Sequence, residues 1–292
     1  MLCVSYNIQY GTGRDGCVDL PRIARSLAGA DLIALQEVER HAQRTGMVDQ
    51  AEALAGLLPG YHWVYGAGLD LHADVLRADG TVLQRRRQFG NMLLSRSPIL
   101  NARNHLLPKM GTLRQFSLQR SALEGVILTP LGRALRVVSV HLSHLSDADR
   151  EDQVLRLLAL HKGAYDEGPG WCGSTVKADF SESIDAGPMP REALLMGDFN
   201  FSARSSLYAR IVGPWSPAYG RMNTRDGFVD TWVEAGHRED EGITCRNGSL
   251  EDGERIDYCF ASTDLASSLR RAWIDSEAAG SDHQPIWVEL AV

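Results

Sequence analysis

The sequence predicts an α/β fold of the α+β kind, in which two mixed β-sheets pack together and helices lie outside. Short runs of β-branched and aliphatic residues recur throughout the 292 residues. Polar or Gly/Pro turns separate these runs, which indicate about ten strands. Helical spacing of apolar residues is confined to three places that do not alternate strictly with the strands. The excess of strands over helices favours two packed sheets over a doubly wound parallel sheet.

The expected elements are short and follow one another in chain order. The first helix begins after the candidate N-cap Asp19, and the other two cover residues 50–58 and residues 147 to about 162. The clearest strands cover residues 2–7, 32–36, 61–66, 91–95, 122–128, 135–141, 193–197, 256–261 and 285–290.

One long segment, residues 163–191, is rich in Gly, Ser, Pro and acidic side chains and shows no periodicity. We expect it to be a long surface loop of the kind that covers a site. It is not expected to be a linker, because the strand that follows it carries the sharpest motif in the chain. We therefore expect residues 1–292 to form a single domain.

The composition is that of an ordinary globular protein, with 44 % hydrophobic and 23 % charged residues. No run approaches the ~20 apolar residues of a membrane helix. The beginning of the sequence has neither the basic nor the apolar region of an export signal. We therefore expect a cytoplasmic protein without a transmembrane segment. The five cysteines are scattered and form no Cys-x-x-Cys pair, so we expect reduced thiols.

The formal net charge of −7 disfavours non-specific binding to a long polyanion, because such binding depends on Lys and Arg. A small anionic substrate is still compatible with this charge, since a bound divalent cation reverses the local sign. The densest basic run, residues 85–87, is expected to be a solvated loop, with contact to a phosphate backbone as the alternative.

Polar side chains that chemistry can use stand where six of the apolar runs end. Loops at the ends of a rigid scaffold are where proteins usually place functional groups. The set contains four carboxylates, two amides and two imidazoles. Its members are Asn7, Glu37, His141, Asp198, Asn200, Asp257, Asp282 and His283.

Several of these residues also have an ordinary structural interpretation. Asn7 and Asp198 are common turn residues, whereas Glu37 is harder to explain, because a carboxylate is rarely buried without a partner. His141 and His144 have the spacing of a zinc pair, but no third ligand lies nearby in the sequence. The combination therefore carries more weight than any single residue.

The ordered motifs resemble the signature of the endonuclease/exonuclease/phosphatase superfamily, and the match spans essentially the whole chain. Asp49-Gln50, Arg150 and Gln153 further resemble the stand-alone bacterial metal-dependent hydrolases of that superfamily. The resemblance implies one catalytic domain with a DNase I-like fold, a four-layer sandwich of two mixed, mainly antiparallel β-sheets flanked by helices. The motifs are Tyr6-Asn7-Ile8, Leu35-Gln36-Glu37, Gly90-Asn91, His141, Gly197-Asp198-Phe199-Asn200, Arg255-Ile256-Asp257-Tyr258 and Ser281-Asp282-His283.

The same resemblance implies a metal site. Glu37 is similar to the main Mg²⁺ ligand of the family, with Asn7 and Asp282 close to the ion. Hard oxygen ligands of this kind suit Mg²⁺, and we expect that Mn²⁺ can substitute for it. With four carboxylates in the set, both one ion and two ions are compatible with the sequence.

The remaining residues are implied to act on the phosphate. Asp198 resembles the carboxylate that orients or deprotonates the attacking water, and Asn200 resembles the amide beside it. Asp257 is similar to the acid that fixes the tautomer of His283, which would act either as a base or as a cationic clamp. His141 resembles a second donor to the phosphoryl oxygens.

We therefore expect a Mg²⁺-dependent phosphodiesterase or phosphomonoesterase whose substrate is a small or lipid-derived phosphate ester. The abasic-site endonucleases of the superfamily carry a tyrosine where this chain has His141, which resembles the sphingomyelinase, phosphatase and general hydrolase branches instead. A metal-dependent endonuclease or exonuclease is the alternative enzyme, so nucleic acid is a less favoured partner. A non-catalytic binding module that retains the fold is the alternative from another class. We expect a monomer.

Overall fold

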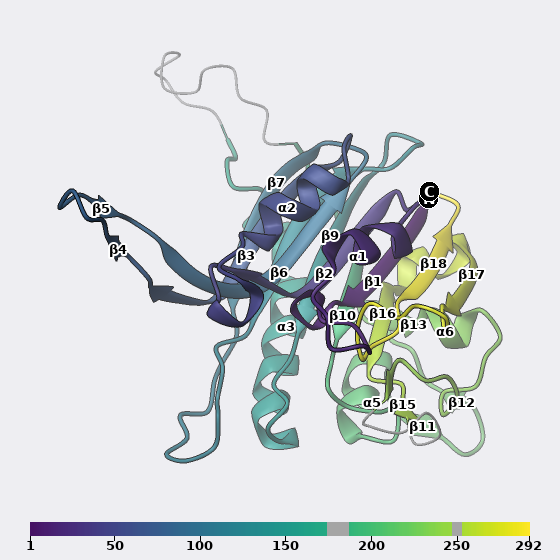
Figure 1. Cartoon of the computed structure of the whole chain (residues 1–292). Helices are drawn as coiled ribbons and strands as arrows, with labels where there is room; N and C mark the ends of the chain where they lie inside the picture. The colour runs from purple at the N-terminus through teal and green to yellow at the C-terminus, as the bar shows by residue number, and fades with distance from the viewer. Residues whose placement is uncertain (174–186, 247–252) are drawn as a thin grey trace.

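Two six-stranded sheets dominate the computed structural model, which describes residues 1–173, 187–246 and 253–292 (Figure 1). One neighbouring pair in each sheet is parallel, β1 with β2 and β9 with β10, and the other pairs are antiparallel. The first sheet has the order β17 (Leu269–Ile274), β18 (Ile286–Leu290), β1 (Leu2–Asn7), β2 (Leu32–Arg40), β6 (Arg86–Ser95) and β3 (His62–His72). The second has the order β13 (Phe228–Asp230), β16 (Asp257–Ser262), β10 (Ala193–Asp198), β9 (Ala134–His141), β8 (Ser121–Leu128) and β7 (Ile99–Leu106).

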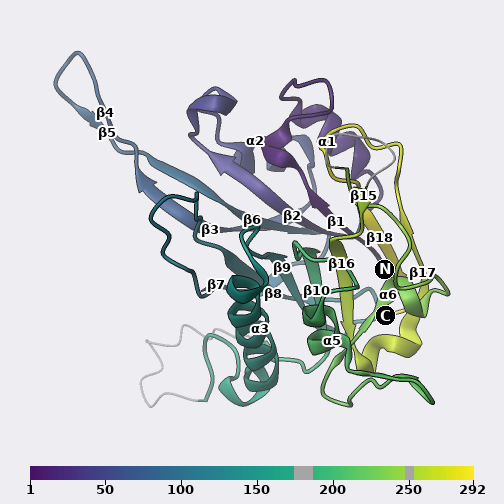
Figure 2. The same ribbon diagram turned by 90° about the horizontal axis from the view of Figure 1, so that it is seen from below.

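Helices cover the outer faces of both sheets, as the view from below shows (Figure 2). Helices α1 (Leu20–Ser26) and α2 (Gln50–Leu57) pack on the first sheet, and α3 (Asp147–Glu167) and α5 (Ser206–Val212) pack on the second. Each of these helices begins at an Asp or Ser whose side chain accepts a backbone N–H. The predicted arrangement of two mixed sheets between layers of helices is confirmed.

Alternation along the central strands divides their side chains between two kinds of core. In β1, Cys3 lies between the two sheets, whereas Val4 lies under the helices of the first sheet. In β9, Val137 lies between the sheets, whereas Val138 lies under α3 and α5. A functional residue can therefore reach the space between the sheets only if it has the parity of Cys3 or Val137.

The sequence does not predict strands β7 and β17, because polar residues interrupt their apolar runs. Both lie at sheet edges, where one side of the strand needs no apolar partner. Shorter elements were also not expected, because two to seven residues are too few for a clear period. They are η1 (Gln9–Gly11), η2 (Gln43–Thr45), β4 (Val75–Leu76), β5 (Val82–Leu83), α5, β11 (Trp215–Ser216), β12 (Gly220–Arg221), β13, α6 (Thr231–Glu234), β14 (Cys245–Arg246), β15 (Gly253–Glu254) and η3 (Thr263–Ser268).

The long loop expected at residues 163–191 begins later than predicted. Helix α3 continues to Glu167 and ends at Gly168, whose φ of 69° is the left-handed conformation that favours glycine. Ala164 packs in a small core cluster with Val126, which stabilises the additional turn. Residues 174–186 of the expected loop lie outside the described residues.

The basic run at residues 85–87 differs from the expected solvated loop. Arg86 and Arg87 are the first residues of β6, and the Nε of Arg86 donates to Asp70 at 2.8 Å. All five cysteines lie among the described residues, and none of them forms a disulfide bond. Among the helices of the described residues, none is long and apolar enough to span a membrane.

Candidate active site

The functional residues predicted from the sequence gather at one end of the space between the sheets. Asn7 is the last residue of β1, His141 the last of β9 and Asp198 the last of β10, while Asp257 is the first residue of the antiparallel strand β16. Side chains alternate between the two faces of a strand, so His141 of β9 projects from the same face as Val137, which lies in the core between the sheets. The strand-end residues of β1, β10 and β16 lie on the inter-sheet face for the same reason. Strand direction and alternation together therefore bring these side chains to one place.

Glu37 reaches the site through a distortion of β2. The pairing of β2 with β6 shifts in register between Leu35 and Val38, and Glu37 lies in this bulge with a φ of 59°. A left-handed conformation is costly for a residue with a Cβ, and such strain is concentrated at functional positions. Burial also raises the pKa of Glu37, and the nearby Arg120 partly offsets that effect.

Three nitrogen atoms converge on one carboxylate oxygen, Oδ2 of Asp198. Nδ2 of Asn7 donates to it at 2.9 Å, Nε2 of His141 lies 3.4 Å away, and Nε2 of His283 lies 3.8 Å away. Burial, and then the negative charge of Asp257, raise the pKa of Asp198 to about 7. Asp198 is thus a buried carboxylate that accepts hydrogen bonds and can also take up a proton near neutral pH.

His283 is held by a second carboxylate on its other nitrogen. Its Nδ1 donates to Oδ2 of Asp257 at 2.7 Å, and both side chains are buried. Burial by itself lowers the pKa of His283, but Asp257, and then Cys245 and Asp198, outweigh it and hold the pKa well above its ordinary value. The protonated ring therefore presents an Nε2–H toward Asp198.

His141 is oriented by Arg120, which sequence reasoning missed. Nη1 of Arg120 lies 3.0 Å from Nδ1 of His141, and Nη2 lies 3.2 Å from Nδ1 of His144. Because a guanidinium can only donate, Nδ1 of His141 must accept, and its Nε2 carries the hydrogen of the neutral ring. Burial, and then Arg120, lower the pKa of His141 well below its ordinary value. The two histidines share one arginine through their Nδ1 atoms.

Asn200 and Asp282 complete the predicted set at the edges of the site. The backbone N–H of Asn200 donates to Oδ1 of Asp198 at 2.9 Å, and its Nδ2 donates to the carbonyl of Leu142 at 3.1 Å. Oδ2 of Asp282 accepts from Nε2 of Gln9 at 2.9 Å. All eight predicted residues therefore lie in or beside one cluster.

The chemistry of the donor set fits a divalent cation. Glu37 and Asp282 supply hard oxygen atoms, and the charge of Asp282 contributes to the raised pKa of Glu37. Nδ2 of Asn7 donates to Glu37 at 3.3 Å and to Asp198 at 2.9 Å, which leaves its Oδ1, the acceptor for the backbone N–H of Gln9 at 3.0 Å, as the atom that could bind a cation. Asp198, Asp257 and His283 also have possible ligand atoms within 4.8 Å of one another, but Nδ1 of His283 is already occupied by Asp257.

Several residues that the sequence left without a role hold the loops around the site. Gln50 accepts from the backbone N–H of Glu39 at 3.0 Å and donates to the carbonyl of Tyr10 at 2.6 Å. Gln153 accepts from the backbone N–H of Ser143 at 2.8 Å and donates to the carbonyl of Pro108. The motif resemblance marked both glutamines, whereas Arg120 and Gln9 carry no comparable signal.

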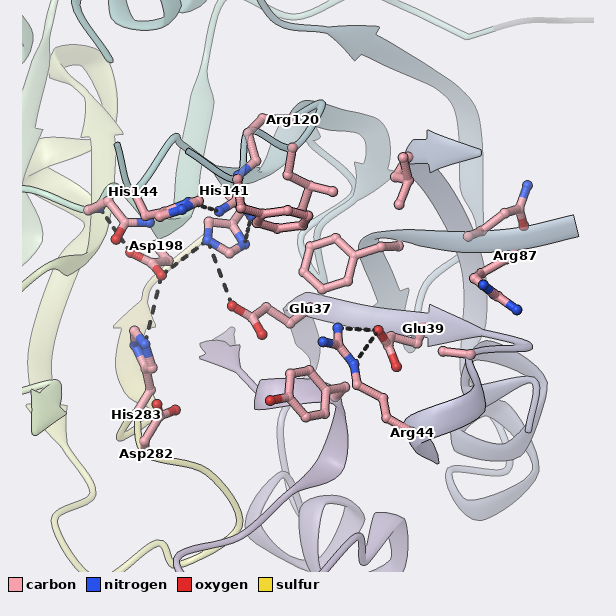
Figure 3. A pocket seen from close by; sticks show the side chains of 18 of the residues that line it. Glu37, Glu39, Arg44, Arg87, Arg120, His141, His144, Asp198, Asp282 and His283 are labelled. Carbon is pink, nitrogen blue, oxygen red and sulfur yellow. Dashed lines mark hydrogen bonds and ion pairs between the residues drawn. The ribbon is translucent and has the colours of Figure 1, made fainter. Parts of the chain in front are cut away.

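The cluster opens into a cavity of about 800 Å³. Figure 3 shows Glu37, His141, Asp198 and His283 pointing toward one another at one end of it. The cavity continues past Glu37 to the other end, where Arg87 lies. A volume of this size suits a small organic molecule rather than a phosphate group alone.

Comparison with known proteins agrees with this geometry. Residues 4–283 match the model of the Endonuclease/Exonuclease/phosphatase family. An endonuclease/exonuclease/phosphatase structure from Beutenbergia cavernae is 24 % identical over 99 % of this chain and 70 % of that chain, with a TM-score of 0.61. One from Bacteroides vulgatus is 19 % identical over 99 % of this chain and 98 % of that chain, with a TM-score of 0.65.

A third solved structure has a more specific description. It is the 3′ phosphatase NExo from Neisseria bound to a product DNA hairpin, which is 17 % identical over 100 % of both chains, with a TM-score of 0.56. At these identities the structural likeness shows a shared fold. No curated protein matches the sequence.

Proposed function

The chain belongs to the endonuclease/exonuclease/phosphatase family, and we propose that it is a Mg²⁺-dependent hydrolase of phosphate esters. It would act as a phosphodiesterase or phosphomonoesterase on a small or lipid-derived substrate. The observation that carries this proposal is the convergence of Asn7, His141 and His283 on one oxygen of Asp198, beside Glu37 and in an open cavity. Hydrolysis of a phosphate ester needs such a positioned base and several donors in one place.

Glu37, Asp282 and Asn7 would hold the metal ion. Their oxygen atoms suit Mg²⁺, and Mn²⁺ would substitute for it. When bound, the ion supplies positive charge that stabilises the developing charge on the phosphate. One ion satisfies this requirement, and the neighbouring carboxylates would admit a second.

Asp198 would orient the attacking water and accept its proton. It is held for this task by the amide of Asn7 and by the backbone N–H of Asn200. A base whose pKa is close to the working pH combines the ionised form with a useful affinity for the proton. Asn200 would add its own side chain to the contacts around the water or a phosphoryl oxygen.

The two histidines would act as donors on the phosphate. His283, paired with Asp257, would serve as a cationic clamp, because the neighbouring carboxylate raises its pKa and favours the charged ring. His141 would donate from its neutral Nε2–H, which Arg120 directs away from itself and into the cavity. Preorganised donors of this kind stabilise charge on non-bridging oxygens without further rearrangement.

A panel of phosphate esters tests the proposal directly. It would contain a chromogenic diester, a monoester, a sphingomyelin or inositol-type headgroup and plasmid DNA, each assayed with Mg²⁺, with Mn²⁺ and with EDTA. We expect metal-dependent turnover of the small esters and none with EDTA. Nicking of the plasmid without ester turnover would favour the nuclease instead, and no turnover of any compound would contradict a catalytic role.

Two substitutions connect turnover to the site. Asp198→Asn is expected to lower kcat by about 10²–10⁴-fold, because a positioned acid–base group contributes that much. Glu37→Gln is expected to raise the Mg²⁺ concentration needed for half-maximal activity by about 10-fold or more. An unchanged metal requirement in the Glu37 variant would show that this residue is not a ligand.

A further inference from the structure

The cavity extends well beyond the residues that would handle the phosphate. We call this part the side pocket and define it by six lining residues. Glu39 and Arg44 lie on the opposite side of Glu37 from His141 (Figure 3). The ring of Phe89, by contrast, lies 6.3 Å from the ring of His141, and the ring of Phe116 lies 6.4 Å from the ring of His144. The six residues are Glu39, Arg44, Leu69, Phe89, Phe116 and Leu118.

The floor of the side pocket is one row of side chains across three strands. Phe89 of β6 pairs with Leu69 of β3 on one side and with Glu39 of β2 on the other. Directly paired residues of antiparallel strands project from the same face of a sheet. The register of the first sheet therefore places an aromatic ring, an aliphatic side chain and a carboxylate next to one another facing the cavity.

The carboxylate in this row is neutralised within the protein. Glu39 is only 3 % exposed, and its Oε1 accepts from Nε of Arg44 at 3.0 Å while its Oε2 accepts from Oγ1 of Thr45 at 3.2 Å. The guanidinium of Arg44 lies 4.0 Å from the centre of the Tyr10 ring. Both charges are therefore neutralised by each other, and Arg87 is a further cation that lines the far end of the cavity.

Another part of the lining is apolar and partly exposed to solvent. Phe116 and Leu118 belong to the loop between β7 and β8 and line the cavity, and Phe116 is 72 % exposed. Covering an exposed aromatic side chain that lines a cavity with an apolar group is favourable, because it removes apolar surface from water. Together with Leu69 and Phe89, it makes an apolar enclosure next to the reaction centre.

We propose that the side pocket binds a mostly apolar organic group of the phosphate ester. The substrates are therefore esters that carry an alkyl or aryl chain of several carbon atoms beside the phosphate. This inference rests on the proposed hydrolase function, because the phosphate must occupy the reaction centre for the organic group to extend past Glu37. The residues that select the substrate are Leu69, Phe89, Phe116 and Leu118.

Binding of two phosphonates in the presence of Mg²⁺ tests the side pocket without requiring turnover. Methylphosphonate and hexylphosphonate carry the same charged group and differ in the length of one chain. Each methylene that leaves water strengthens binding by up to about 4-fold. We expect isothermal titration calorimetry to show that hexylphosphonate binds at least about 10-fold more tightly. Equal affinities would overturn the inference.

Variants of one loop provide matched controls. Phe116→Ser and Leu118→Ser are expected to remove most of the preference for hexylphosphonate and to leave the affinity for methylphosphonate within about 2-fold. Leu113→Ser changes a fully exposed residue of the same loop that does not line the cavity, so it should keep the preference. Loss of the preference in the Leu113 variant, or its retention in both side-pocket variants, would contradict the proposal.

The two proposals fail in different ways. If neither phosphonate binds and no ester is turned over, the proposed hydrolase function is wrong, and so is the inference about the side pocket. If esters are hydrolysed but both phosphonates bind equally, only the side-pocket inference is wrong.

Discussion

Two arginine–histidine pairs lie at the second sheet, and in both a buried arginine donates to Nδ1 of the histidine. Arg120 is 6 % exposed and donates to Nδ1 of His141, and Arg136 is 1 % exposed and donates to Nδ1 of His161. In both pairs burial, and then the arginine, lower the pKa of the histidine. The local chemistry alone therefore does not distinguish them.

The difference lies in what the second ring nitrogen meets. Nε2 of His141 faces the carboxylates of Asp198 and Glu37 at the end of the inter-sheet space. The ring of His161 instead packs against Phe228, with 4.4 Å between the ring centres. Arg136 lies on the face of β9 that α3 covers. Arg120 thus orients the Nε2–H of His141 toward the cavity, whereas the contact of Arg136 with His161 packs a helix against the sheet.

The largest difference expected between the two pairs is in turnover, when the imidazole of each pair is removed. His141→Ala should lower turnover of the best ester of the panel by about 10²–10³-fold, the usual effect of losing one preorganised donor. His161→Ala should leave kcat within about 2-fold, because its ring has no access to the cavity. Initial rates at saturating Mg²⁺, with circular dichroism to verify folding, measure both. Equal losses of turnover would remove the distinction between the pairs.

Removing each arginine should affect stability in the opposite order: loss of Arg136 should lower the free energy of unfolding more than loss of Arg120. Arg136→Met removes the guanidinium whose Nε lies 3.9 Å from the buried carboxylate of Glu124 and leaves this carboxylate with the imidazole of His105, at 3.8 Å. We expect the free energy of unfolding to fall by about 2–3 kcal/mol, somewhat less than for a close buried ion pair. Arg120→Met leaves two imidazoles without their donor and removes a positive charge that partly offsets the raised pKa of Glu37. It should cost about 1 kcal/mol while it lowers turnover.

Urea unfolding of both arginine variants measures the free energies, and the ester assay measures turnover. Arg120→Lys provides a control, because it keeps a positive charge but not the two donors that reach His141 and His144. Restored turnover in the lysine variant would indicate that charge, rather than orientation of the ring, is what Arg120 supplies.

The sequence predicted the residues of the site better than the residues that orient them. Asn7, His141 and Asp198 end apolar runs, so their positions follow from strand direction and alternation, which are local properties. Arg120 lies just before β8, 21 positions before His141 (141 − 120), and meets it only because β8 and β9 pair. No local period contains that information.

The same limit applies to the fold and to the side pocket. The central strands were predicted because both of their faces are buried, whereas the edge strands β7 and β17 carry polar residues toward solvent. The row of Glu39, Phe89 and Leu69 depends on the register of three strands. Register is set by tertiary packing and by the bulges in β2 and β3, so it could not be predicted from short apolar runs.

The smallest expected effect is the pH dependence of stability that His161 contributes. Burial, and then Arg136, lower its pKa to about 4, whereas an unfolded histidine has a pKa of about 6.5. The folded state therefore favours the neutral ring. This contribution to stability is complete above pH ~6.5 and is lost as the pH falls toward 4.

Comparison of the wild type with His161→Gln isolates this contribution, because glutamine does not titrate. The destabilisation caused by the substitution should shrink by about 1–2 kcal/mol between pH 7 and pH 4.5, a value reduced for the partial exposure of the ring. Urea unfolding at several pH values measures it. A destabilisation that stays constant, or grows as the pH falls, would show that His161 is not held neutral by Arg136, and the parallel with His141 would then be limited to geometry.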